Sequence, residues 1–234
     1  MARTKLKLKS ITTGTLPGAI KVASENINGT LPSALTVGSA VAEDTKVVFD
    51  GNAQDFHIGL DDSTDSLTVG LGSALGTTSH MIINASGQVR KPNTPSFLTY
   101  GAPTMSSPSA GSGYFYNFGN TAQSFDNGGH YDNSTGKFTC PVAGKYMFGL
   151  SICRGESYSG NNQLIYVSKN STASGGQYVG SNASASQQYD QIQCHFIYDM
   201  AANDYALGTF YVSGGTFSRF ASTPRNYFYG FLIG

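Results

Sequence analysis

The residues that could hold a metal ion or carry out catalysis are scattered along this 234-residue chain. Asp61, Asp62 and Asp65 could suggest a Ca²⁺ site, but they lack the Asp-x-Asp-x-Asp-Gly loop pattern with a distal Glu. We therefore expect solvated turn carboxylates there, with Ca²⁺ as the open alternative, and no other metal and no cofactor. The four histidines stand in separate segments, at His57, His80, His130 and His195.

The short motifs that mark common catalytic centres are missing from the sequence. It has no Gly-x-Ser-x-Gly nucleophile turn, no phosphate-binding Gly-rich loop and no His-Glu-x-x-His zinc motif. We expect a protein that is not an enzyme. The open alternative is catalysis by scattered Asp residues, as in a capsule-cleaving spike, because pairs of catalytic carboxylates follow no fixed spacing in sequence.

Three cysteines, Cys140, Cys153 and Cys194, are too few and too widely spaced for a disulfide framework. No Cys-x-x-Cys or paired Cys/His spacing indicates a zinc site. We interpret them as free thiols, mostly buried.

Charge and hydropathy exclude two classes of partner. Fourteen basic residues balance fourteen acidic ones, so no overall basic excess favours nucleic acid. No apolar stretch approaches the roughly 20 residues of a spanning helix, so we expect no membrane insertion. The first residues also lack the apolar core of a signal peptide, which predicts synthesis and assembly in a cytoplasm.

The N-terminal segment predicts an extended arm over residues 1–44. It begins with cations at period two, namely Arg3, Lys5, Lys7 and Lys9. These belong either to a frayed, solvated terminus or to an arm that docks an acidic partner. A short repeat follows, GTLPGAIKV at Gly14–Val22 and GTLPSALTV at Gly29–Val37. Each copy is too small to bury a core, so the repeat predicts a shaft or an anchor that lies on other chains.

The rest of the chain predicts an all-β protein. Its 29 glycines, 14 tyrosines and 14 phenylalanines suit many short strands joined by tight turns. We expect a small β-hairpin module at 45–90, a Pro/Ser/Gly-rich linker that opens the next domain at 91–112, and a β-sandwich at 113–234. Strict alternation in Tyr146–Cys153 and Ile192–Tyr198 indicates half-buried strands. Such aromatic strands leave an apolar outer face, which another subunit normally covers.

The segment FDNGGHYDNSTGKFTCPVAGKYMF at Phe125–Phe148 closely resembles the signature of C1q-like domains. The ending YGFLI at Tyr229–Ile233 is similar to the closing strand of that family. The resemblance covers roughly Ser96–Gly234 and implies a jelly roll of the C1q and tumour-necrosis-factor type that assembles as a homotrimer. No collagen-like Gly-X-Y repeat precedes it. The matching positions within the signature are Gly129, His130, Tyr131, Asp132, Thr135, Gly136, Phe138, Pro141, Gly144, Tyr146 and Phe148.

The segment before the linker resembles parts of bacteriophage tail-fibre and head-fibre proteins. The resemblance rests on the T-L-P repeats and on the tract that begins FDGN at Phe49 and ends Ser-Gly-Gln-Val at Val89. It implies a short trimeric tail fibre or spike on the virion surface, whose arm binds other virion proteins, either a tail hub or adaptor or the capsid. The alternative is a capsid-bound head fibre or decoration protein with the same trimeric fold.

The knob is then expected to bind a glycan or protein of the host-cell surface through loops at Glu156–Gln163 and Ser174–Gln188. Candidate receptor contacts in and beside these loops are Tyr158, Asn161, Asn162, Tyr178 and Asn182. The alternative is that these loops are only long and solvated. An animal-type secreted C1q protein is a further alternative, favoured by Asn-x-Ser/Thr triplets at Asn28, Asn84, Asn133, Asn170 and Asn182.

Overall fold

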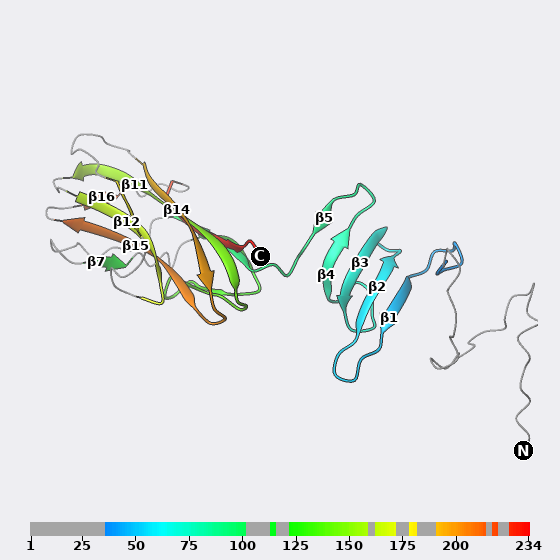
Figure 1. Cartoon of the computed structure of the whole chain (residues 1–234). Helices are drawn as coiled ribbons and strands as arrows, with labels where there is room; N and C mark the ends of the chain where they lie inside the picture. Colours follow the sequence, from blue (N-terminus) through cyan, green and yellow to red (C-terminus); the bar gives the residue numbers. More distant parts are fainter. Residues whose placement is uncertain are drawn as a thin grey trace, which may run out of the picture. The chain divides into compact units, whose positions relative to one another are not determined.

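The computed structural model describes residues 36–101, 113–115, 122–158, 162–171, 178–181, 191–213, 217–219 and 225–234 (Figure 1). Every regular element in these ranges is a β-strand, which confirms the predicted all-β class. The chain forms two compact units, Met1–Val41 and Ala42–Gly234. The cations Arg3, Lys5, Lys7 and Lys9 and nearly all of the T-L-P repeat lie outside the described residues, so the anchor assignment stays a prediction.

A five-stranded antiparallel meander forms from residues 45–90, in the order β1-β2-β3-β4-β5. At the β2–β3 turn the backbone N–H and the hydroxyl of Ser63 donate to Asp61 Oδ1 at 3.1 and 2.6 Å. Asp65 takes a φ of +50° in the same turn. The Asp61 carboxylate therefore closes a turn. The strands are β1 (Thr45–Phe49), β2 (Phe56–Asp61), β3 (Ser66–Leu71), β4 (Ser79–Ile83) and β5 (Val89–Arg90).

Two further sheets face each other as a jelly-roll sandwich. One sheet has the order β13-β12-β15-β10-β9, with β7 also paired to β15, and the other has the order β14-β11-β17-β6-β8, with β16 paired to β11. Their strands are β6 (Ser96–Tyr100), β7 (Gly113–Phe115), β8 (Ala122–Asn127), β9 (Tyr131–Asp132), β10 (Lys137–Thr139), β11 (Gly144–Tyr158), β12 (Asn162–Lys169), β13 (Tyr178–Ser181), β14 (Gln191–Met200), β15 (Tyr205–Ser213), β16 (Phe217–Arg219) and β17 (Tyr227–Leu232).

The core of the sandwich is aromatic. Phe97 stacks on both Tyr131 and Phe138 with ring centroids 4.7 Å apart, and Phe228 meets it edge-on at 5.0 Å. The inward positions of β11 and β14 complete this core. The alternation predicted Tyr146, Phe148, Leu150, Ile152, Ile192, Cys194 and Tyr198, which are buried, and Phe196, which is only partly buried; Met200, beyond the predicted run, is buried as well. The single sandwich therefore buries its large side chains between the two sheets.

The signature segment supplies the turns that direct these strands. Gly128, Gly129 and Gly136 have φ values of +89°, +70° and +74°, a region that glycine adopts without strain. The Asp126 carboxylate accepts the backbone N–H groups of His130 and Tyr131 at 3.0 and 3.1 Å. The signature residues thus set the chain direction between β8 and β10, and His130 packs edge-on against Phe138.

The three cysteines form no disulfide and are buried, as the sequence predicted. Burial raises the pKa of both Cys140 and Cys194 to about 12. Because the thiolate is the reactive form, these two side chains are chemically inert near neutral pH.

Candidate functional site: an apolar sheet face and two ends of the jelly roll

The outer face of the β14-β11-β17-β6-β8 sheet carries aromatic and aliphatic side chains. Its central row runs across five paired strands, through Phe125, Leu98, Tyr229, Gly149 and His195. The neighbouring rows add Phe231, Met147 and Ile197 on one side, and Tyr100 and Tyr227 on the other. Phe125, Phe231 and Ile197 are 45%, 37% and 59% exposed. We call this set the knob face.

Tyr229 lies at the centre of the knob face. Its ring stacks between Tyr227 and Phe231, with centroids 6.1 and 6.3 Å away. A Cβ placed at Gly149 would lie 2.3 Å from this ring, so the glycine lets the tyrosine lie flat on the sheet. The Tyr229 hydroxyl is also within hydrogen-bond distance of His195 Nδ1, at 3.0 Å. The centre of the face is therefore a fixed aromatic ladder.

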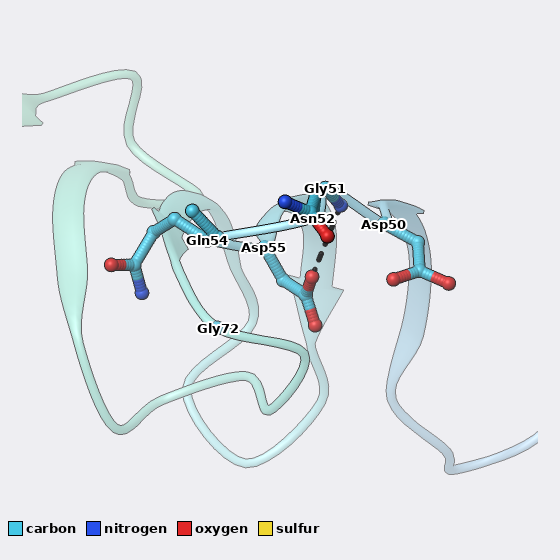
Figure 2. A pocket seen from close by; sticks show the side chains of 7 residues that line it. Asp50, Gly51, Asn52, Gln54, Asp55 and Gly72 are labelled. Atoms are coloured by element: carbon cyan, nitrogen blue, oxygen red, sulfur yellow. Dashed lines mark hydrogen bonds between the residues drawn. The ribbon is translucent and has the colours of Figure 1, made fainter.

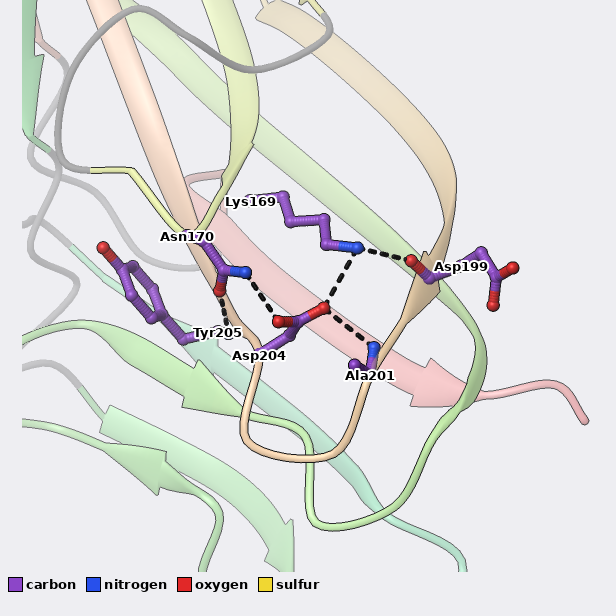
Figure 3. A network of polar contacts seen from close by, with 6 residues as sticks. All are labelled: Lys169, Asn170, Asp199, Ala201, Asp204 and Tyr205. Carbon is purple, nitrogen blue, oxygen red and sulfur yellow. Dashed lines mark hydrogen bonds and ion pairs between the residues drawn. The ribbon is translucent and has the colours of Figure 1, made fainter.

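A polar network ties the turn after β12 to the β14–β15 turn at one end of the sandwich (Figure 3). Asp204 Oδ1 accepts the Asn170 side-chain amide at 2.6 Å, and its Oδ2 accepts the Ala201 backbone N–H at 2.8 Å and Lys169 Nζ at 3.0 Å. Lys169 also donates to the backbone oxygen of Asp199. These contacts hold the end of β12 against the β14–β15 hairpin. The network therefore fixes these two turns against each other.

Because of these hydrogen bonds, chiefly the one from Asn170, the pKa of Asp204 falls from 3.8 to about 2. A lowered carboxyl pKa means that the folded state gains stability above about pH 4 and loses that gain as the pH falls through about 2. At pH 7 we expect Asp204→Asn to lower the melting temperature by about a few degrees. The difference from wild type should shrink as the pH falls from about 4 to 2. Thermal melts of both proteins between pH 7 and pH 2 test this prediction. A difference in melting temperature that does not change with pH would contradict it.

The chain enters the sandwich at the same end as this network. Pro95 accepts the Leu232 N–H at 3.0 Å, and Gly234 accepts the Lys145 N–H at 2.6 Å. β11 starts at Gly144 at this end and finishes at Tyr158 at the opposite end, where β12 begins at Asn162. The sandwich therefore has an entry end and a far end.

The receptor-contact candidates are distributed over the far end and one sheet edge. Tyr158 closes β11 and Asn162 opens β12, so their backbones meet at the far end. Tyr178 lies in edge strand β13, opposite Tyr166. Asn161 and Asn182 lie outside the described residues. Three of the five candidates are thus strand residues, because β11, β12 and β13 extend into the segments expected to be loops. Their role in binding stays a prediction.

A hollow of about 390 Å³ opens beside the β1–β2 turn (Figure 2). Within it Asp55 Oδ1 accepts the Gly51 N–H at 3.2 Å, and the Asp55 backbone oxygen accepts the Gly72 N–H at 2.8 Å. Among the residues that the structure describes, no group of three His, Cys, Asp or Glu side chains could hold a metal ion. The hollow is lined by Asp50, Gly51, Asn52, Ala53, Gln54, Asp55 and Gly72.

No helix within the described ranges is long and apolar enough to cross a membrane.

These features define a jelly-roll knob with one apolar sheet face and two distinct ends. The C1q domain family model matches residues 107–233, more than half of the chain, and the chain belongs to that family. Strand β6 precedes the matched residues, yet it pairs with β17 in the same sheet. A search of curated proteins finds no significant match.

Several solved structures are similar to this chain. The globular domain of zebrafish complement 1qA protein has 16% identity, covers 60% of this chain and 98% of its own, and gives a TM-score of 0.40. Murine APRIL at pH 8.5 has 10% identity, with coverages of 59% and 98% and a TM-score of 0.40. Eiger TNF from S. frugiperda has 10% identity, with coverages of 61% and 94% and a TM-score of 0.42.

Proposed function

We propose that this chain is a structural protein of a bacteriophage particle, a short trimeric tail fibre or spike whose C1q-like knob binds the host-cell surface. The observation that carries the proposal is the knob face, which leaves more apolar surface open than a lone knob needs. Three copies that meet through this face bury it and form a closed assembly. The function is adhesion, and it requires neither a cofactor nor a reaction.

The composition of the knob face supports burial between copies. None of the eight large side chains that dominate it is charged; they are Leu98, Tyr100, Phe125, Met147, Ile197, Tyr227, Tyr229 and Phe231. Tyrosine and phenylalanine anchors are the residues that contribute most to protein interfaces. Burial raises the pKa of Tyr229, and a phenol is already neutral at physiological pH because its ordinary pKa is about 10. Packing three such faces together therefore removes apolar surface from water without burying a charge.

The two ends of the knob support adhesion at the far end. The chain reaches β6 at the entry end, where the Pro95 carbonyl accepts the Leu232 N–H, and β11 ends and β12 begins at the opposite end. In a trimer, three equivalent far ends point away from the stalk. Several weak contacts to a surface glycan or protein then add up through effective concentration, so no deep pocket is required. The partners are two further copies, virion proteins at the arm and a host surface molecule.

A capsid-bound head fibre or decoration protein is the second candidate, because the same knob face would serve its trimer. The two candidates differ in the virion protein that the arm meets. Both place the chain on the virion surface after assembly in the host cytoplasm.

Adhesion is tested by letting the purified chain compete with virus particles for the host-cell surface. Purified full-length chain added to host cells should reduce adsorption of the virus that encodes it, because it occupies the receptor. A chain with Tyr158→Ala and Tyr178→Ala should compete less well than one with the exposed entry-end substitution Asp199→Ala. Undiminished adsorption at saturating chain would contradict the proposed receptor-binding role.

Deleting residues 1–44 should leave trimerisation intact and abolish incorporation into particles, because the arm makes the virion contact. The measurement is the amount of chain in purified particles after infection with the deletion mutant, compared with total chain in the lysate. The same ratio in deletion mutant and wild type would refute the anchor assignment.

A further inference from the structure

The five-stranded meander has its apolar side chains on an open face. Seven of them are between 42% and 57% exposed, namely Val47, Phe49, Phe56, Ile58, Leu60, Leu67 and Val89. The strand register places them in continuous rows. Val47 lies opposite Ile58, which lies opposite Val69 and then Met81, and Leu60 continues through Leu67 to Ile83 and Val89. We call this surface the module face.

The opposite face of the same sheet is covered, although its residues are small or polar. His57, Asp61, Ser66 and Thr68 are at most 7% exposed. The segment after β3 covers them, since the Gly72 carbonyl lies 2.9 Å from His57 Nδ1. A Cβ at Gly59 would also lie 3.0 Å from the Leu75 side chain. The polar face is therefore the one that the chain covers by itself, and the apolar face is not.

We propose that the module face is a second self-association surface, packed against the module faces of the other two copies of this chain in the trimer. This inference rests on the proposed trimer and extends it to the meander. A single sheet of this size has no core of its own, so its apolar face must be buried against another layer to stabilise it.

The area of the module face fits an interface between copies. Phenylalanine has about 150–250 Å² of surface. With Phe49, Phe56 and five aliphatic residues each about half exposed, the face leaves several hundred Å² of apolar surface open. That is at the upper limit for a patch on a monomer. With the half-buried Val69, Leu71, Met81 and Ile83, the face approaches the roughly 800 Å² per partner of a standard interface.

The charge and connectivity of the face favour further copies of this chain as its occupant. None of the strand positions on the module face is Asp, Glu, Lys or Arg, so identical faces meet without like-charge repulsion. The meander also precedes β6 by only a short segment, residues 91–95. Knobs held as a trimer therefore keep three module faces at high effective concentration. At such a concentration even a weak interface between the module faces forms.

The test measures whether a new thiol on the module face is accessible. Ile58→Cys is made in the full-length chain and in a Tyr229→Arg chain, which is expected not to assemble through the knob face and is checked by sedimentation. Lys46→Cys is the matched control, because Lys46 is exposed on the neighbouring strand and on the other face. The three native thiols are buried and give the blank rate. Leu60→Cys serves as a second site if circular dichroism shows that Ile58→Cys perturbs the sheet.

We expect a water-soluble alkylating reagent to modify Ile58→Cys at least about tenfold more slowly in the trimer than in the dissociated Tyr229→Arg chain. The Lys46→Cys rate should be the same in both. Fast modification of Ile58→Cys in a chain that sediments as a trimer would overturn the proposal and leave the face to another virion protein. Equal protection in trimer and monomer would also overturn it, because the chain's own arm would then cover the face. Sedimentation of the unsubstituted chain as a monomer would instead refute the trimer itself.

Discussion

Tyr229→Arg is expected to convert the assembled chain into monomers that keep their fold. The substitution places a guanidinium at the centre of the knob face, so three like charges would have to be desolvated together when the copies meet. Loss of an aromatic anchor worth about 2 kcal/mol already weakens association about 30-fold, and the buried charge adds to that loss. Sedimentation over a range of protein concentrations measures the change.

The control for this prediction is Thr139→Arg. Thr139 is exposed in β10, on the sheet that does not carry the knob face. The Thr139→Arg substitution adds the same charge as Tyr229→Arg, and we expect it to leave the assembly unchanged. If Tyr229→Arg and Thr139→Arg sediment alike, the knob face is not the surface through which the copies associate.

Phe97→Ala is expected to cost about 3–5 kcal/mol of folding stability. Phe97 is 1% exposed and contacts three other rings of the core, those of Tyr131, Phe138 and Phe228. Its removal leaves a cavity between the two sheets that rigid strands cannot close. A loss of this size is a large part of the 5–15 kcal/mol that stabilises a typical domain.

Denaturant unfolding at fixed protein concentration measures this loss, because the stability of an oligomer depends on concentration. Val142→Ala is the control, since Val142 is 47% exposed in a turn and its truncation should cost about 0.5 kcal/mol or less. A Phe97→Ala penalty as small as that of Val142→Ala would show that the aromatic stack does not hold the sandwich together.

The sandwich could be predicted from the sequence because its signals are local. Alternation identified the inward residues of β11 and β14, and the glycines of the signature segment lie where a positive φ is required. The expected apolar outer face is also present. What alternation could not give is the strand order, since the partners of Tyr229 on β6 and β11 lie far away in sequence.

The polar network at the entry end could not be predicted from the sequence either, because its residues are also far apart along the chain. Lys169, Asn170 and Asp204 are common turn residues, and their pairing spans some 34 positions. The local sequence around Asn203 is typical of a turn, and in the structure Asn203 takes a φ of +71° just before Tyr205. That signal predicts a turn, but it does not predict which distant side chain the turn will bind.

The meander shows a different limit. Its strands alternate as half-buried strands do, and alternation alone would place Phe56, Ile58 and Leu60 inside. The structure instead buries His57, Gly59 and Asp61 beneath the segment that follows β3. Period two separates the two faces of a sheet but does not say which face the same chain covers. The sequence pattern predicts that the apolar face of the meander is buried, whereas the single chain leaves it exposed. The proposed burial between copies would remove this disagreement.

The most direct test of the central claim is to locate the chain by gold-labelled antibody and electron microscopy of purified particles of the bacteriophage to which the proposal assigns it. We predict label on the tail appendages, in multiples that fit trimeric fibres. Label over the head would assign the chain to head fibres or capsid decoration. Particles that carry no label, while the lysate contains the folded chain, would contradict a virion role.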